Sequence, residues 1–365
     1  MLNRMCGPAQ IGGSSFVAVV RILALCAVAS AAGCQNSTLR PINELDLRDE
    51  ALSGLKAGIR YDASPLIRAQ AIEALSTTAP NQGRRYFREA LRDPSPAVRF
   101  AAAMALGTME DAGSTDLLRA RLNDEDLNVQ AAAIFALHRL GEQTHTSMLS
   151  DRLLRDPDVE VRRNAALILG QLGEPGSIRL LRHATRDKDE SVVLQAHEAM
   201  AMLGDAKALQ QLALQAYDGA GHRQALALLS MGRTGDVRFV EVLRFRLREG
   251  PHLETKLAAA RALGELGYPD GLEVAIDAAD FDKPERGVPG DAPANQVRRV
   301  RTMSALALGA IGDTRALPAL KKRLEDQSNP RVQLAAAKSI LEILNRDQPW
   351  KHSAGSSART ASSNP

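Results

Sequence analysis

Residues 156–173 read DPDVEVRRNAALILGQLG, and the pattern of this stretch recurs through most of the chain. Val161, Ala165 and Leu169 are spaced four residues apart, so on a helix of ~3.6 residues per turn they lie within about 80° of one another. The stretch therefore predicts a helix with one apolar stripe. Its small central residue, Ala165, would let a second helix approach closely.

The same unit occurs nine times, with successive copies about 31 residues apart except for one interval of 45. The residues equivalent to Val161 are Ile67, Val98, Val129, Val161, Val192, Arg223, Thr255, Val300 and Val332. Four residues later stand Ala71, Ala102, Ala133, Ala165, Ala196, Ala227, Ala259, Ser304 and Ala336. Because a second helix precedes each of these, as in SIRLLRHA at 177–184, the units are two-helix hairpins. We predict an all-α fold, an α–α superhelix of about nine two-helix repeats over residues 42–346.

Polar residues recur at fixed places around the apolar stripe. An aspartate lies five residues before the reference position in six units, where its side chain could accept hydrogen bonds from free N–H groups at a helix entrance: Asp62, Asp93, Asp124, Asp156, Asp187 and Asp218. A basic residue follows the reference position directly in five units, at Arg68, Arg99, Arg162, Lys256 and Arg301. The repeated arginines suggest a ladder of charge-assisted hydrogen bonds to the aspartates along the stack. Glycines twelve residues after the reference suit left-handed helix ends: Gly141, Gly173, Gly204, Gly235, Gly267 and Gly312.

These motifs resemble the HEAT-like repeat of the phycobilisome-lyase type, whose pattern runs D-P-x-x-x-V-R-x-x-A-A-x-A-L-G-x-L-G. The best matches are VRRNAALILGQLG at 161–173, VRFAAAMALG at 98–107 and VRTMSALALGAIG at 300–312. The resemblance implies a HEAT-like solenoid. It leaves function open, because such repeats occur in lyases, hydroxylases and scaffolds alike.

The first 33 residues have the layout of a secretory signal peptide, with arginines, no acidic residue and an apolar run, ILALCAVASAA, at 22–32. The run is followed by Gly33 and Cys34, and this junction resembles a bacterial lipobox, in which the cysteine is diacylated. The resemblance implies a lipid on Cys34, a tether over 34–41 and an exported protein facing the periplasm. Gln35 indicates the outer membrane in the enterobacterial sorting pattern. The other interpretation is ordinary cleavage near an incidental cysteine.

Charge and cysteine content exclude several classes of site. Without residues 1–33 the chain has 44 basic and 43 acidic residues, so no broad field attracts nucleic acid. The three cysteines, Cys6, Cys26 and Cys34, lie ahead of the repeats and offer no metal site there. HEAT-repeat hydroxylases hold a di-iron centre with four His-Glu pairs, whereas this chain has one, His197-Glu198, which we expect on a solvated face. We predict no catalytic residues, no cofactor and no metal.

Two features could bind a partner. Apolar residues opposite the stripe would form a groove on the concave side unless neighbouring repeats cover them: Phe100, Met104, Phe135, Leu167, Leu194 and Leu257. The expanded interval contains the Pro- and Gly-rich segment 280–296, an insertion that is either functional or disordered. Residues 347–365 are too polar and small to pack, and we expect a disordered tail.

The sequence favours a lipoprotein scaffold, anchored to the membrane through Cys34, that binds protein partners of unknown identity. The alternative is an enzyme of the phycobilin-lyase or HEAT-repeat hydroxylase type that uses the concave face. A third possibility is an oligomeric structural element.

Overall fold

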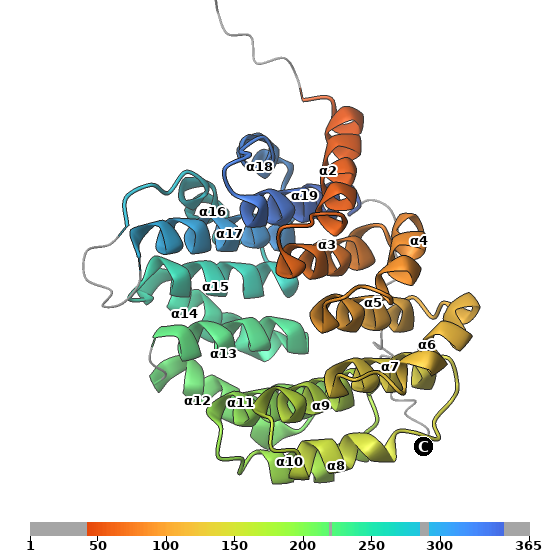
Figure 1. The fold of residues 1–365 in the computed structure, drawn as a ribbon. Coiled ribbons are helices and arrows are strands. Elements are labelled where there is room, and N and C mark those ends of the chain that lie inside the picture. The colour runs from red at the N-terminus through yellow and green to blue at the C-terminus, as the bar shows by residue number, and fades with distance from the viewer. Residues whose placement is uncertain (1–41, 219–220, 285–291, 347–365) are drawn as a thin grey trace, which may run out of the picture. The chain divides into compact units, whose positions relative to one another are not determined.

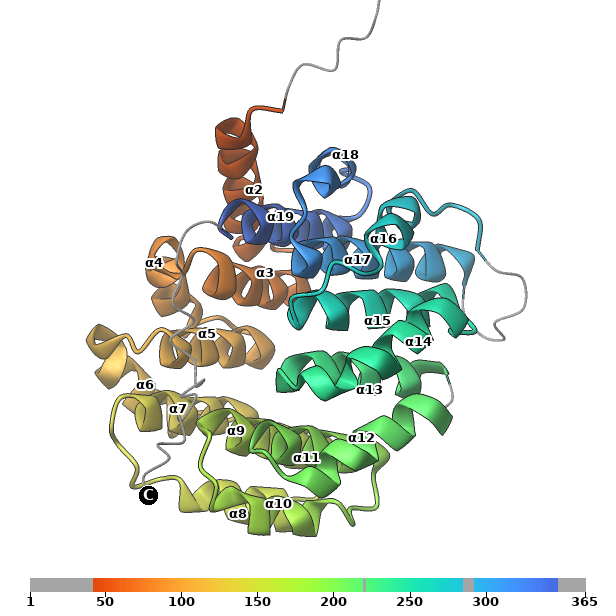
Figure 2. The ribbon, with the colours of Figure 1, turned by 180° about the vertical axis from the view of Figure 1, so that it is seen from behind.

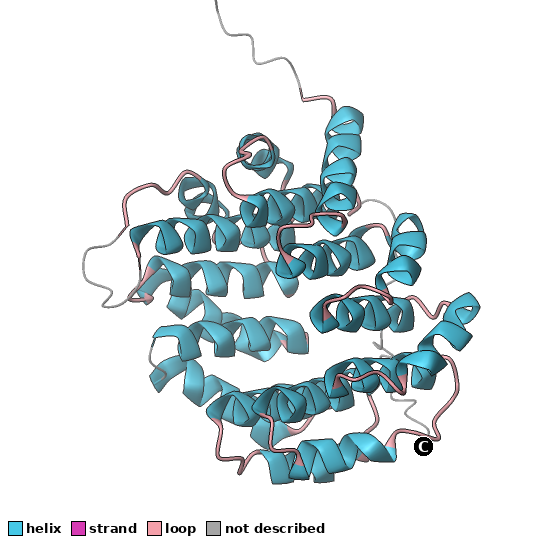
Figure 3. Ribbon diagram, viewed as in Figure 1, coloured by secondary structure: helices cyan, strands magenta, loops and turns pink. Residues whose placement is uncertain are grey.

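The computed structural model describes residues 42–218, 221–284 and 292–346 (Figure 1). The predicted signal peptide, the tether with Cys34, residues 285–291 of the predicted insertion and the predicted tail lie outside the described residues. Helices joined by short turns make up the described part, which contains no strand (Figure 3). The all-α prediction is confirmed.

The helices form nine consecutive pairs, as the repeat predicts. The second helix of each pair, which we call the inner helix, lies toward the centre of the array (Figures 1 and 2). The inner helices are α3 (Pro65–Thr78), α5 (Pro96–Thr108), α7 (Leu127–Arg139), α9 (Val159–Leu172), α11 (Glu190–Met202), α13 (Gly221–Thr234), α15 (Leu253–Glu265), α17 (Pro293–Ile311) and α19 (Pro330–Leu344).

The first helices of the pairs after the first one lie on the outside (Figures 1 and 2). These outer helices are α4 (Pro80–Ala90), α6 (Thr115–Arg121), α8 (Ser147–Arg155), α10 (Ser177–Ala184), α12 (Ala206–Asp218), α14 (Val240–Glu249), α16 (Leu272–Ala279) and α18 (Leu317–Leu324). The first pair begins with α2 (Glu44–Ile59).

The central residues of the apolar stripes are the most deeply buried column of the array. All nine, from Ala71 to Ala336, are buried with 0% exposure, including Ser304. Ser304 donates a hydrogen bond through Oγ to the carbonyl oxygen of Ala275 at 2.6 Å, which satisfies its hydroxyl inside the core. The predicted buried face of the inner helices is confirmed.

The predicted ladder of Arg–Asp pairs joins adjacent repeats, each arginine reaching an aspartate 25 residues further on. Arg99 donates two hydrogen bonds to Asp124, from Nε at 2.9 Å and from Nη2 at 2.7 Å. Arg68 binds Asp93 and Arg162 binds Asp187 in the same two-point way, and Arg301 lies 3.6 Å from Asp326. Each pair links the helix entrance of one repeat to that of the next.

The recurring aspartates act differently from the prediction. Asp93, Asp124, Asp156 and Asp187 accept hydrogen bonds from the backbone N–H two residues on, at 2.8 to 3.1 Å, ahead of the inner helix. In three repeats the helix is instead capped by a later aspartate, at Asp126, Asp158 and Asp189. The first aspartate shapes the turn, and in three of these four repeats, at Asp93, Asp124 and Asp187, its carboxylate is also held by the arginine of the preceding repeat.

The glycines that follow the inner helices are in the left-handed region, as predicted, with φ between 71° and 96° at Gly141, Gly173, Gly204, Gly235, Gly267 and Gly312. The second repeat has Glu110 at this place, and Glu110 has a φ of 52°. It is the non-glycine residue with positive φ among those described. Its backbone therefore adopts a conformation that a side chain disfavours.

The predicted insertion is shorter than expected at its C-terminal end. Helix α16 ends at Ala279, but α17 begins at Pro293, inside the predicted loop 280–296. Pro293 occupies the first turn of α17, where its fixed φ suits a helix and its missing N–H costs nothing. The insertion thus extends the inner helix at its N-terminal end.

The array closes on itself within residues 44–346. Each inner helix packs against the next, and α19, at the end of the array, packs against both α2 and α3 at its beginning (Figure 1). Gly58 of α2 permits this approach, because an added Cβ would lie 2.6 Å from a methyl carbon of Leu334. Closure places side chains of the first and last repeats next to one another.

Candidate functional site

Two of the six predicted partner-binding residues are core residues. Phe135 is 4% exposed and belongs to a large apolar cluster, and Leu257 is 0% exposed. The prediction was wrong for both, since neighbouring inner helices cover this face of α7 and α15. The ring of Phe135 lies close to Gly107 of α5, because a Cβ added at Gly107 would lie 2.9 Å from Phe135 Cδ1.

The other four residues are partly accessible. Phe100, Met104, Leu167 and Leu194 are half-buried, and all but Leu167 pack against the core cluster that contains Phe135. Their exposed edges are compatible with a contact surface on α5, α9 and α11. Their role in partner binding stays a prediction.

A more exposed apolar group lies on the outer helices, away from the predicted groove. Tyr217 of α12 and Phe245 of α14 are 46% and 38% exposed, and their ring centroids lie 5.8 Å apart. Leu214, one turn before Tyr217, is also exposed. We call Leu214, Tyr217, Phe245 and Arg246 the aromatic patch.

Arg246 holds the aromatic patch together. Its guanidinium carbon lies 5.0 Å from the ring centroid of Tyr217 and 5.2 Å from that of Phe245, within cation–π range. Its Nη2 donates to the carbonyl oxygen of Tyr217 at 2.7 Å. Arg246 thus contacts both rings, and both rings remain partly exposed to solvent. The signal in the sequence is a lone phenylalanine among the arginines of RFR at 244–246.

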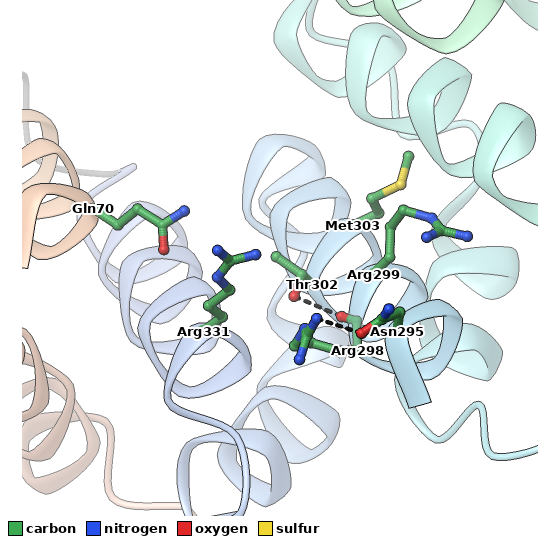
Figure 4. A pocket seen from close by; sticks show the side chains of 7 residues that line it. All are labelled: Gln70, Asn295, Arg298, Arg299, Thr302, Met303 and Arg331. Carbon is green, nitrogen blue, oxygen red and sulfur yellow. Dashed lines mark hydrogen bonds between the residues drawn. The ribbon is translucent and has the colours of Figure 1, made fainter. Parts of the chain in front are cut away.

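A second candidate site is a basic pocket where the array closes. It lies between α3, α17 and α19, has a volume of about 380 Å³, and is lined by Gln70, Asn295, Arg298, Arg299, Thr302, Met303 and Arg331 (Figure 4). Arg298 donates to Asn295 Oδ1 at 2.7 Å, and Arg299 pairs with Glu254 of α15 at 2.9 Å. The repeat pattern does not predict this pocket, because its residues converge only when the first and last repeats meet.

Glu198 lies inside the fold and His197 is half-buried, whereas we expected the His197-Glu198 pair on a solvated face. Glu198 is buried and accepts hydrogen bonds from Arg233 Nε at 2.6 Å and Ser230 Oγ at 2.8 Å. Burial lowers the pKa of His197, and its buried Nδ1 has no hydrogen-bond partner among the described residues. The packing of α11 against α13 explains the difference from the expectation, because it turns Glu198 toward a cationic neighbour.

Arg233 balances the charge of Glu198. Burial lowers its pKa, but the hydrogen bond from Arg233 to Glu198 and the charges of Glu198, Glu265 and Glu73 outweigh this effect, so the pKa is raised overall. Arg233 therefore stays protonated, and Glu198 is engaged in an ion pair with it. Across the described ranges there is no group of three or more His, Cys, Asp and Glu side chains arranged to hold a metal ion.

Stacked helix pairs of this kind define an α-helical repeat protein. The family model of HEAT repeats matches residues 52–138, 146–232 and 294–341, more than half of the chain. The chain therefore belongs to the HEAT-repeat family. Every helix that the structure describes is too short or too polar to cross a lipid bilayer.

Comparison with curated proteins finds no match. Among solved structures, human deoxyhypusine hydroxylase in complex with glycerol is 19% identical, covering 84% of this chain and 99% of the hydroxylase, with a TM-score of 0.35. The CpcE–CpcF complex of phycocyanin lyase from Nostoc sp. is 22% identical, covering 71% and 94%, with a TM-score of 0.33. Kap121p is 16% identical, covering 81% of this chain and 37% of Kap121p, with a TM-score of 0.32.

Proposed function

We propose that this HEAT-repeat protein is a lipoprotein scaffold that binds another protein through the aromatic patch on α12 and α14. The observation that supports this most is the exposed pair of Tyr217 and Phe245, ordered by Arg246. Tyrosine, tryptophan and arginine side chains contribute most of the binding energy at protein interfaces. Burial of these rings under a partner removes apolar surface from water. The loss of side-chain conformational entropy is small, because Arg246 already contacts both rings.

The aromatic patch is tested by capture with matched variants. We expect the Tyr217→Ser, Phe245→Ser double variant to lose a protein that co-purifies with the wild type after crosslinking in membranes, identified by mass spectrometry. Leu194→Asp on α11 serves as the comparison for the inner face. Loss of the same protein with folded Leu194→Asp, but not with the patch variant, would place the partner on the inner helices instead.

We propose further that the chain is exported and anchored to a bacterial membrane by a lipid on Cys34, facing the periplasm. The basic start, the apolar run and the Gly33-Cys34 junction support this proposal. Palmitate labelling and membrane fractionation test it. We expect the wild type to be labelled and membrane-bound, and Cys34→Ala to lose both properties. Equal labelling of the variant would end the lipoprotein proposal.

The scaffold proposal includes no catalytic role. It is tested by elemental analysis and absorption spectra of the purified full-length protein. We expect neither a stoichiometric transition metal nor a chromophore. Either one, retained through purification, would favour an enzyme of the hydroxylase or phycobilin-lyase type.

A further inference from the structure

The basic pocket of Figure 4 is lined by three arginines, Arg298, Arg299 and Arg331. The seven earlier repeats have no arginine at the equivalent positions. The residue just before the reference position is arginine only in the last two repeats, at Arg299 and Arg331. In the earlier repeats the equivalent residues are Leu66, Ala97, Asn128, Glu160, Ser191, His222 and Glu254. Arg298, beside Arg299, adds a third positive charge on α17. The positive charge is therefore specific to the point where the array closes.

The charges of this pocket are only partly compensated by the protein. Arg299 is paired with Glu254 at 2.9 Å, but in the part of the chain that the structure describes no carboxylate forms an ion pair with Arg298 or Arg331. The arginines of the ladder differ, since Arg68, Arg99 and Arg162 each hold an aspartate by two hydrogen bonds. Two half-buried guanidinium groups thus lack a counter-charge among the described residues.

The position of Arg331 on its helix adds to the positive potential. Arg331 lies in the first turn of α19, and the side chain of the preceding Asn329 makes no capping hydrogen bond. Helix N-termini carry partial positive charge and favour anions, so arginine there is unfavourable unless a negative group is close by. Helices α7, α9 and α11 have that negative group, because Asp126, Asp158 and Asp189 cap them.

We propose that the basic pocket binds a phosphate group. Guanidinium groups donate paired hydrogen bonds that match phosphate oxygens, and a phosphate dianion would neutralise the two unpaired arginines. The amides of Gln70 and Asn295 supply further donors at the pocket wall. The volume of about 380 Å³ leaves room for a small organic group beside the phosphate. This site is distinct from the aromatic patch and does not depend on the scaffold proposal.

The phosphate could belong to a soluble phosphate ester or to a lipid headgroup, and two probes distinguish these sources. The full-length protein in detergent is titrated by calorimetry with inorganic phosphate and, separately, with dihexanoyl phosphatidic acid, a short-chain lipid whose phosphate is a monoester. Saturable binding of inorganic phosphate alone assigns the site to a soluble dianion. Tighter binding of the short-chain lipid assigns it to a headgroup.

Variants locate the binding in the pocket. We expect Arg331→Gln to weaken binding at least about tenfold, and Arg298→Gln combined with it to weaken binding further, because each removes a charge-assisted hydrogen bond. Arg163→Gln is the matched control, since Arg163 lies on the inner helix α9 but is paired with Glu160 at 2.9 Å. We expect this control to bind like the wild type.

Two outcomes would overturn the proposal. One is the absence of saturable binding to the wild type by either probe up to about 10 mM, well above the affinity expected of a site with several charge-assisted hydrogen bonds. The other is unchanged affinity in the folded Arg331→Gln variant. Should the double variant fail to fold, the melting temperatures of the wild type and of Arg331→Gln are compared with and without phosphate. A smaller rise in Arg331→Gln supports the proposal, and an equal rise overturns it.

Discussion

Asn345 donates a hydrogen bond through Nδ2 to the carbonyl oxygen of Thr78 at 2.9 Å, joining the end of α19 to the end of α3. The same Asn345 accepts through Oδ1 from Arg48 Nη1 of α2 at 2.5 Å, and Arg48 also donates to the carbonyl oxygen of Leu344. One side chain therefore links the last repeat to both helices of the first. In an open repeat array the terminal units contact one neighbour each, whereas here they contact each other.

Asn345→Ala should weaken this closure. Removal of the side chain leaves the Thr78 carbonyl and the Arg48 guanidinium without these partners, and we expect a loss of about 1–2 kcal/mol in the free energy of unfolding. Urea denaturation followed by circular dichroism measures it. Asn81→Ala, which removes an exposed amide bonded to Arg84 at 3.0 Å, is the control and should cost much less. Faster hydrogen exchange in α2 than in α9 would show that the variant opens at the closure; uniform exchange would contradict this explanation.

Gly170→Ala should disturb the packing of α9 against α11. An added Cβ at Gly170 would lie 2.7 Å from the Cβ and 2.9 Å from the Cα of Ala199, so the backbone of one helix must shift. We expect a cost of about 1–3 kcal/mol, typical of overpacking. Gly176→Ala is the control, because no atom lies within 4 Å of its added Cβ and its φ of −60° suits alanine. Thermal unfolding of both variants checks the contrast, and equal stabilities would refute the close approach of these two helices.

The repeat pattern predicts much of the fold because its features depend on fixed, short intervals in the sequence. The helix faces depend on intervals of four residues, and the Arg68–Asp93 type of pair depends on a fixed interval of 25, so both follow from the spacing. The role of Asp124 does not, since capping and turn formation require the same residue type at nearly the same place. In the structure the later aspartate, Asp126, caps α7, and Asp124 shapes the turn before it.

The candidate sites could be predicted less well, because they depend on distant segments. Gln70 and Arg331 line one pocket only through the sum of small rotations over nine repeats, which no single repeat specifies. Phe135 and Leu257 occupy equivalent faces to residues that remain partly exposed, and local crowding by α5 and α13 decides their burial. The pairing of Tyr217 with Phe245 likewise needs the outer helices α12 and α14 to lie side by side.

The Arg99–Asp124 pair makes stability depend on pH in the acid range. Burial raises the pKa of Asp124, but the hydrogen bonds from Arg99 and from the Asp126 N–H, with the charges of Arg99 and Arg121, outweigh it and lower the pKa overall. A carboxyl whose folded pKa lies below its unfolded value of about 3.9 stabilises the fold above that pH. This contribution is lost as the pH falls from about 4 through the folded pKa.

Asp124→Asn tests this dependence. Near pH 7 we expect the variant to be less stable by about 3 kcal/mol, because the buried Arg99 loses its buried partner and keeps only the exposed carboxylate of Glu125. The difference between wild type and variant should shrink as the pH is lowered from 5 to 3, measured by urea denaturation at each pH. Asp116→Asn, at an exposed pair with Arg119, should show no such convergence. A constant difference across the range would mean that Asp124 titrates alike in the folded and unfolded states.

Glu110 offers a comparison of two variants that isolates backbone strain. Glu110, with a φ of 52°, stands where six other repeats have glycine, and its side chain pairs with Arg139. Both Glu110→Gly and Glu110→Ala remove the ion pair, but only glycine adopts the left-handed conformation without a clash of Cβ against the following carbonyl. We therefore expect Glu110→Gly to be more stable than Glu110→Ala by about 1 kcal/mol in chemical denaturation. Higher stability of the alanine variant would show that the turn after α5 relaxes out of the left-handed region when the pair with Arg139 is absent.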